Sequence, residues 1–125
     1  MIAIDSKKFV QEYFDAISGK PKTPALLGEY ISDAELIEHI MVFENAFPNY
    51  DLLADDFICE DNKVVVRARA KGKHQGDLMG IAPTGMPIDL PFVIIYEISN
   101  EKISKGWLFY DSKVLMDQLG LGSSN

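Results

Sequence analysis

Residues 63 to 76 alternate between two kinds of side chain, and this pattern constrains the fold more than any other stretch of the chain. Even positions are small or apolar up to His74, whereas odd positions are mostly basic. Period-two alternation is typical of a β-strand with one face in the interior and one in water. Along the interior face the side chains shrink from Val66 through Ala70 to Gly72. Because packed cores leave little empty space, these small residues predict a cavity beside the strand.

Three more strands are expected, at about 50–60, 86–99 and 102–111, with hairpin turns at Glu60–Lys63 and Asn100–Glu101. In the strand over 86–99, Val93 and Ile95 make the outer face partly apolar, which indicates a second layer or a subunit interface. In the last strand, alternate residues should share the inner face: Ile103, Lys105, Trp107, Phe109 and Asp111.

The first half of the chain is expected to be helical. Apolar residues recur at helical spacing between Ser6 and Ile17, and a short helix should follow the Thr23 cap with Pro24 in its first turn. Ser32 and Glu35 form a capping-box pattern before a third helix that ends at Pro48. Helices followed by hairpin-linked strands indicate an α+β fold. We expect a cone: three N-terminal helices on a strongly curved, mainly antiparallel sheet of about four to six strands, enclosing a pocket.

Length and charge narrow the range of functions. The chain has 125 residues, and we expect one domain over 1–121 and a frayed polar tail at 122–125. The net charge of −7, with basic residues spread along the chain, argues against a nucleic-acid partner. No apolar run is long enough to cross a bilayer, so no membrane association is expected. The single cysteine, Cys59, excludes an internal disulfide and suits a reducing cytoplasm.

Asp111 is the strongest candidate for chemistry. If it shares the inner face with Trp107 and Phe109, burial should raise its pKa and make it an acid or base useful near neutral pH. Alternatively, the strand ends at Asp111 and its carboxylate caps a tail helix beginning near Ser112. The spacing alone leaves both interpretations open.

The two histidines are weaker candidates for a catalytic role. His74 could be a hydrogen-bond donor or proton carrier facing the pocket; the plainer interpretation is a buried histidine bonded to a backbone carbonyl, or one in the following loop. His39 is expected at the edge of the apolar stripe of the third helix, bonded to Glu35. The histidines and Cys59 lack the spacing of metal ligands, so we expect no metal.

Aromatic and sulfur-containing side chains could line the pocket beside the two candidate catalytic residues, although such residues at helical or strand spacing are more often core. The candidates for substrate binding are Trp107, Tyr13, Phe14, Phe47, Met79, Phe92, Tyr96 and Phe109.

Several spaced motifs resemble one known family. The run from Gly72 to Gly85 (GKHQGDLMGIAPTG) is similar to the G-T-H-x-G-x-x-x-G-I-P-P-T-G segment of SnoaL-like polyketide cyclases and related ester-cyclase-type proteins. The run from Lys102 to Asp111 resembles their G-K-I-x-E-x-W-x-x-x-D strand, and Met116 to Gly120 their L-x-Q-L-G ending. The resemblance covers roughly 36–120. It implies the cone-shaped nuclear-transport-factor-like fold, shared with ketosteroid isomerase, and a homodimer formed through the sheets.

The resemblance also implies roles for individual residues. Asp111 matches the aspartate that is the acid/base catalyst of ring closure in the cyclases, and His74 matches the histidine of the G-T-H motif, taken as pocket-lining. This chain departs from the pattern at Lys105, where the cyclases carry glutamate. It also departs near Tyr96 and Glu97, where they carry a histidine.

Two functional hypotheses follow, with a third behind them. The first is a cofactor-independent cyclase or isomerase, in which Asp111 removes a proton alpha to a carbonyl of a small hydrophobic substrate and His74 or Tyr96 donates to the enolate oxygen. The second is a protein that binds an apolar small molecule or peptide in the same pocket without chemistry, which the departures at Lys105 and Tyr96 favour. The third is a dimeric interaction module that uses the face carrying Val93 and Ile95.

Overall fold

The computed structural model describes residues 5 to 121, so the expected tail at 122–125 lies outside the described residues. Its helices and strands follow in the order α1 (Ser6–Ile17), α2 (Pro24–Gly28), α3 (Ala34–Ala46), β1 (Asp51–Glu60), β2 (Lys63–Lys73), β3 (Pro87–Ser99), β4 (Lys102–Tyr110) and α4 (Ser112–Gln118). No helix within 5–121 is long and apolar enough to cross a membrane.

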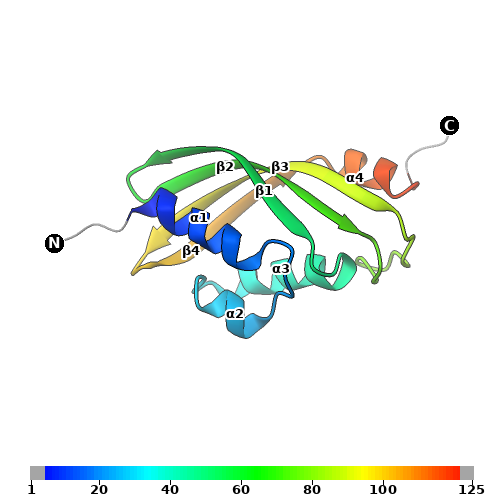
Figure 1. The fold of residues 1–125 in the computed structure, drawn as a ribbon, viewed down its shortest axis with the longest axis horizontal. Coiled ribbons are helices and arrows are strands. Elements are labelled where there is room, and N and C mark those ends of the chain that lie inside the picture. The colour runs from blue at the N-terminus through cyan, green and yellow to red at the C-terminus, as the bar shows by residue number, and fades with distance from the viewer. Residues whose placement is uncertain (1–4, 122–125) are drawn as a thin grey trace.

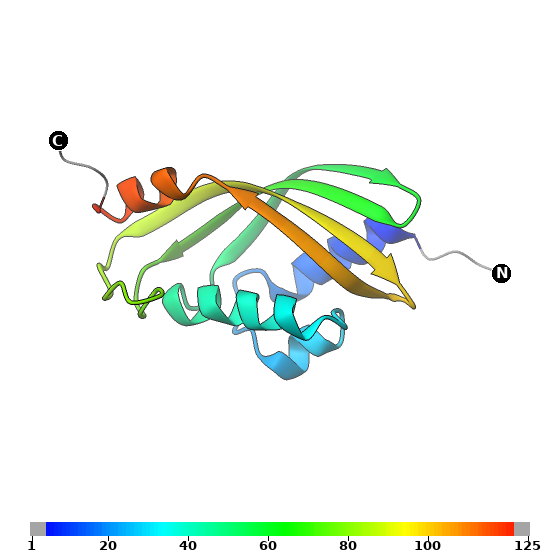
Figure 2. The ribbon, with the colours of Figure 1, turned by 180° about the vertical axis from the view of Figure 1, so that it is seen from behind.

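The four strands form one antiparallel sheet in the order β1-β2-β3-β4. Both expected hairpin turns are present, and Asp61, Asn100 and Glu101 adopt positive φ angles in them. The sheet is curved, and α1, α2 and α3 lie on its concave side, whereas α4 follows β4 at one end (Figures 1 and 2). The expected α+β architecture is therefore confirmed, with four strands in the described part of the chain.

The helix starts follow local capping chemistry. Asp5 accepts a hydrogen bond from the Lys8 N–H at 3.1 Å, and Thr23 caps α2 ahead of Pro24. The capping box predicted at Ser32 is wrong: Asp33 is the N-cap of α3, because its carboxylate accepts from the Glu35 N–H at 3.0 Å. The Ser32 hydroxyl instead contacts the Ile103 carbonyl of β4 at 3.4 Å.

The concave face of β2 follows the predicted alternation. Val64, Val66 and Ala68 are fully buried beneath the helices. At Gly72 the missing side chain makes room for the α3–β1 turn, since a Cβ there would lie 3.1 Å from the Cβ of Tyr50 and 3.3 Å from that of Phe47. The room predicted at Gly72 is therefore filled by protein, whereas the room beside Ala70 remains open and belongs to the cavity described below.

A β-bulge in β4 reverses the faces that the alternation predicted. Glu97 pairs with Lys105 and Ile98 pairs with Ile103, so Ser104 is an extra residue that no β3 residue faces in the strand register. One extra residue moves all following side chains to the opposite face. Ile103 is buried as expected, but Leu108 and Tyr110 face the concave side, and Trp107 and Phe109 lie on the convex side opposite Ile95 and Val93.

Candidate functional site

The concave side encloses a cavity of about 80 Å³ between α3 and the sheet. It is half-open and almost entirely apolar. Its wall is made by residues of α1, α3, the α3–β1 turn and all four strands: Tyr13, Leu36, His39, Ile40, Phe43, Phe47, Tyr50, Leu52, Ala70, Ile88, Leu90, Phe92, Ile94, Tyr96, Leu108 and Tyr110. The volume is below the roughly 150 Å³ that accommodates benzene in an engineered apolar cavity, so a ligand of the size of benzene or larger would have to displace side chains or extend through the open side.

Four tyrosines supply most of the polar chemistry of the wall. Tyr13, Tyr50 and Tyr96 are buried, and the Tyr13 and Tyr96 rings pack edge to face with centroids 6.0 Å apart. Burial raises the pKa of all three phenols, and neighbouring phenols add to the rise for Tyr13 and Tyr96. These hydroxyls therefore stay protonated and act as hydrogen-bond donors. Among residues 5–121, no Asp, Glu, Lys or Arg lines the cavity.

The partly exposed part of the wall lies on α3 and β4. His39 is exposed there, with its ring 5.6 Å from that of Phe43. The Phe43 ring in turn meets Tyr110 of β4 edge to face at 6.1 Å. The rim position expected for His39 is thus observed. Within the described residues no hydrogen bond joins it to Glu35.

Asp111 lies outside the cavity. The strand ends at Tyr110, and Asp111 is the exposed N-cap of α4, where its Oδ1 accepts from the Lys113 N–H at 2.9 Å and the Val114 N–H at 3.4 Å. The inner-wall placement is therefore wrong and the helix-cap alternative is correct. The cause is the bulge at Ser104, which turns Tyr110 inward in its place.

His74 is completely buried just beyond β2 but does not line the cavity. Its Nδ1 accepts from the Thr84 N–H at 3.1 Å and lies 3.0 Å from the Thr84 hydroxyl, while its ring packs against Phe47 at 5.3 Å. Nε2 is buried without a hydrogen-bond partner among the described residues. The plainer interpretation of a buried histidine at the start of a loop is correct, although its partner is Thr84 rather than a backbone carbonyl.

Of the eight residues expected to bind substrate, the structure places Tyr13, Phe47, Phe92 and Tyr96 on the cavity wall. Phe14 is buried in the core beside Tyr96 rather than on the wall. Three others are exposed away from the cavity: Trp107, Phe109 and Met79. The bulge moves the first two to the convex side, and Met79 lies in the loop after β2, where its neighbour Leu78 is the buried residue.

Sequence reasoning missed several wall residues. Leu36, Ile40 and Phe43 belong to the apolar stripe of the third helix, so their helical spacing could have identified them as wall residues. No such pattern marks Tyr50, because the strand expected from residue 50 is irregular. Within 5–121, no group of three His, Cys, Asp or Glu side chains is placed to hold a metal ion.

Comparison with known proteins gives a family match. The family model for SnoaL-like polyketide cyclase matches residues 8–119. No curated protein sequence matches the chain.

Solved structures share the fold at low sequence identity. TsrD from Streptomyces laurentii is 19% identical, with a TM-score of 0.77, covering 97% of this chain and 99% of that one. A SnoaL-like polyketide cyclase from Agrobacterium tumefaciens is 14% identical, with a TM-score of 0.76, covering 94% and 100% of the two chains. AclR from Streptomyces galilaeus is 20% identical, with a TM-score of 0.77, covering 93% and 81%. At these identities the likeness shows the shared cone-shaped fold.

Proposed function

Because the chain belongs to the SnoaL-like polyketide cyclase family, we propose that it uses its cavity to bind a small, uncharged, largely apolar molecule that carries a hydrogen-bond acceptor such as a carbonyl oxygen. The observation that carries this proposal is the wall itself: apolar side chains and protonated phenols, with no Asp, Glu, Lys or Arg among the described residues that line it. An apolar pocket with a few polar groups is the usual form of a small-molecule site. A protein that binds a ligand without catalysing a reaction requires no further functional group in the pocket.

The proposal predicts that acetophenone binds more tightly than ethylbenzene, which has nearly the same shape but no acceptor. One hydrogen bond to a buried phenol should be worth about fivefold in affinity. Ala70→Leu, which adds three carbons to the wall, should weaken both ligands at least tenfold, roughly the effect of filling the space they would occupy. Ligand-observed NMR titration measures these affinities.

Ala25→Leu is the matched control, because Ala25 is exposed on α2 and its substitution adds the same atoms away from the cavity. It should leave both affinities unchanged. Equal affinity of Ala70→Leu and the wild-type protein for acetophenone would place the ligand elsewhere and overturn the proposal.

A second candidate, enolisation catalysis, is supported by His39 on the cavity wall. Imidazole is the side chain that exchanges protons near neutral pH. It would take an alpha proton from a bound ketone while the bonding electrons move to the carbonyl oxygen, which accepts a hydrogen bond from a phenol. Loss of the acetophenone methyl proton signal in D₂O, dependent on protein, would favour this candidate over simple binding. Asp111 has no part in it.

We also propose that the convex side of the sheet forms a homodimer. Cross-strand register places four apolar residues in one row on that side, Ile58, Val65, Ile95 and Trp107. The neighbouring row alternates in charge: Glu60, Lys63, Glu97 and Lys105. A second copy, related by a two-fold axis that runs parallel to the strands, would stack its sheet on this one with β1 facing β4 and β2 facing β3. Each charge of this row would then face a charge of the opposite sign. The two apolar rows would also face each other. Such self-complementarity is what a two-fold interface requires.

Trp107→Glu should convert the dimer to a monomer. Trp107 is the largest side chain of the apolar row and is 39% exposed. The Nζ atoms of Lys63 and Lys105 lie within 6 Å of its ring. Truncation of a tryptophan that is buried in an interface can weaken the interface about 30-fold or more. Analytical ultracentrifugation at micromolar concentration measures the change. Val42→Glu, at an exposed apolar residue of α3, should stay dimeric; a wild-type protein that is monomeric throughout would refute the dimer.

A further inference from the structure

Lys22 is a lysine with a fully buried side chain, in the loop between α1 and α2. Lysine side chains are almost never fully buried unless they are paired. Burial lowers the pKa of Lys22, and the neighbouring Glu44 carboxylate opposes the shift. A buried charge of this kind persists only where the surrounding groups are arranged to compensate it.

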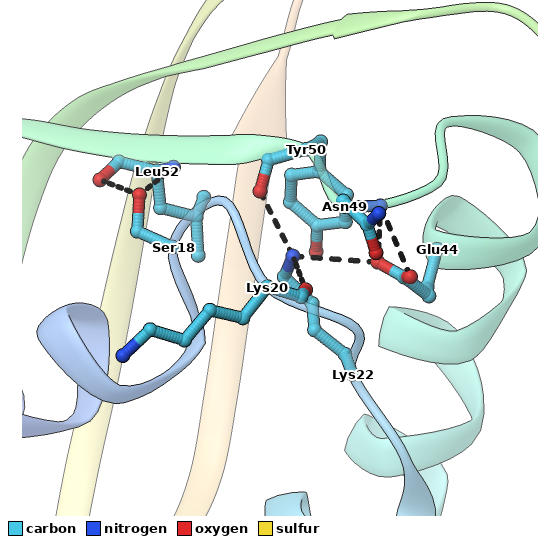
Figure 3. A network of polar contacts seen from close by, with 7 residues as sticks. All are labelled: Ser18, Lys20, Lys22, Glu44, Asn49, Tyr50 and Leu52. Carbon is cyan, nitrogen blue, oxygen red and sulfur yellow. Dashed lines mark hydrogen bonds and ion pairs between the residues drawn. The ribbon is translucent and has the colours of Figure 1, made fainter.

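The compensating groups are all in place (Figure 3). The Lys22 ammonium donates to the backbone carbonyl oxygen of Lys20 at 3.1 Å, to that of Tyr50 at 2.8 Å and to Oε1 of Glu44 at 3.3 Å. An ammonium group has three donors, and each has an acceptor. Lys22 therefore has no donor left for a ligand, and it does not itself line the cavity. An effect of Lys22 on the cavity has to pass through a neighbouring residue.

That neighbour is Tyr50. Besides bonding its carbonyl oxygen, the Lys22 Nζ lies 3.9 Å from the centroid of the Tyr50 ring, a close cation–π contact in a desolvated place. The same tyrosine lines the cavity. Glu44 holds the preceding residue as well, because both its carboxylate oxygens accept from the Asn49 N–H, at 3.2 and 3.1 Å.

We propose that Lys22 is a positioning residue of the cavity, which holds the main chain and the ring of Tyr50 in the cavity wall. This inference rests on the proposed function to the extent that the cavity binds a ligand. Without the ammonium, the Tyr50 ring loses this cation–π contact. The cavity then loses a defined wall at this point, and a ligand must order the ring when it binds.

The test compares three variants. Lys22→Met keeps an unbranched side chain that is one atom shorter, and it removes the charge and the donors. Lys22→Arg keeps a cation that can stack on the ring. Lys20→Met removes an exposed lysine two residues away, whose Nζ donates to the Asp15 carbonyl oxygen. Acetophenone affinity is measured at a temperature at which circular dichroism shows every variant folded.

Lys22→Met should weaken acetophenone binding about fivefold, because the ligand must then order the freed Tyr50 ring as it binds. Lys22→Arg should recover part of the loss, and Lys20→Met should match the wild-type protein. A purely structural role would lower the melting temperature of Lys22→Met but leave the affinity of the folded protein unchanged. That outcome would overturn the proposal.

NMR of ¹³C-labelled tyrosine rings separates this inference from the proposed function, because it needs no ligand. If the wild-type protein fails to bind acetophenone, the proposed function fails, yet the Tyr50 ring signals should still move in Lys22→Met and stay in Lys20→Met. Unmoved Tyr50 signals would refute the positioning role whatever the ligand does.

Should Lys22→Met not fold, an alkaline titration of the wild-type protein gives the same information. The groups around the ammonium are Glu44, Asp51 and Tyr50. Because burial lowers the pKa of Lys22 and raises that of Tyr50, Lys22 loses its proton first as the pH rises. The Tyr50 ring signals should therefore shift before that phenol ionises; a single shift at its own ionisation would contradict the proposal.

Discussion

Replacement of Gly76 by alanine should destabilise the fold by about 3 kcal/mol, a large effect for the addition of one methyl group. The N–H groups of Gln75 and Gly76 both donate to the Ala46 carbonyl oxygen, at 2.9 and 3.1 Å, so this loop lies directly against the end of α3. A Cβ at Gly76 would overlap the Asn45 carbonyl oxygen. Backbone cannot rotate away as a side chain can, so the loop and the helix must separate.

Urea denaturation measures this change as a fall in the free energy of unfolding. Gly28→Ala is the control, because a Cβ at Gly28 meets nothing within 4 Å and the residue lies at the end of α2. That variant should be within about 0.5 kcal/mol of the wild-type protein, or slightly more stable. Equal stability of the two variants would show that the loop does not lie against α3 as described.

Glu44→Ala should destabilise the protein by roughly 3 kcal/mol or more at pH 7, because it leaves the buried Lys22 ammonium without its counter-charge. The Glu44 side chain is 10% exposed and that of Lys22 is 0% exposed, so the ammonium lies away from solvent and depends on its protein partners. The Asn49 N–H loses its acceptor at the same time. Thermal or urea denaturation measures the loss.

The pH dependence of Glu44→Ala gives an independent check. Removing Glu44 lowers the Lys22 pKa further, while the unfolded chain keeps a lysine pKa of about 10.4. Between these two values the unfolded state binds more protons than the folded state, so stability rises with pH. The deficit of Glu44→Ala relative to the wild-type protein should therefore shrink as the pH approaches 10.

Two control variants accompany this prediction. Glu38→Ala, at an exposed residue of the same helix, should change stability by less than about 0.5 kcal/mol. Combining Glu44→Ala with Lys22→Met should cost less than the sum of the single changes, since no buried charge is then left unpaired. Additive losses would show that the two side chains do not interact energetically.

The fold could be predicted largely from local patterns. The alternation over 63–76, the helical stripes and the turn residues each constrain a few neighbouring positions, and together they lead to helices on a curved antiparallel sheet. The error at Ser32 has the same local origin: Ser32 and Asp33 are adjacent caps of similar quality. The long-range contacts of Ser32 with β4 decide between them, because both its N–H and its hydroxyl donate to the Ile103 carbonyl oxygen.

The candidate site could be predicted only in part, because one residue decides the faces of β4. Nothing in the run Ile103-Ser104-Lys105 indicates a bulge, and an unbroken alternation puts Trp107, Phe109 and Asp111 inside. With the bulge they lie outside, or at a helix start in the case of Asp111. The apolar convex side expected at Val93 and Ile95 is consequently broader than the sequence indicated.

Long-range contacts account for the remaining omissions. Lys22 looks like a surface lysine in the sequence, and its burial depends on residues 22 and 28 positions further along the chain. Tyr50 lines the cavity because the missing side chain at Gly72 lets the α3–β1 turn approach the sheet. Neither feature produces a periodic pattern in the amino-acid sequence.

The aromatic pair formed by Phe43 and Tyr110 has a consequence for exchange kinetics. The pair joins α3 to β4 across the partly exposed side of the cavity. An edge-to-face contact is worth about 1 kcal/mol beyond the area that the rings bury, so a separated pair should be present less than about one-fifth of the time. If the pair re-forms over a bound molecule, entry and escape slow by the same factor. The residence time of a ligand would then lengthen while its equilibrium affinity stays the same.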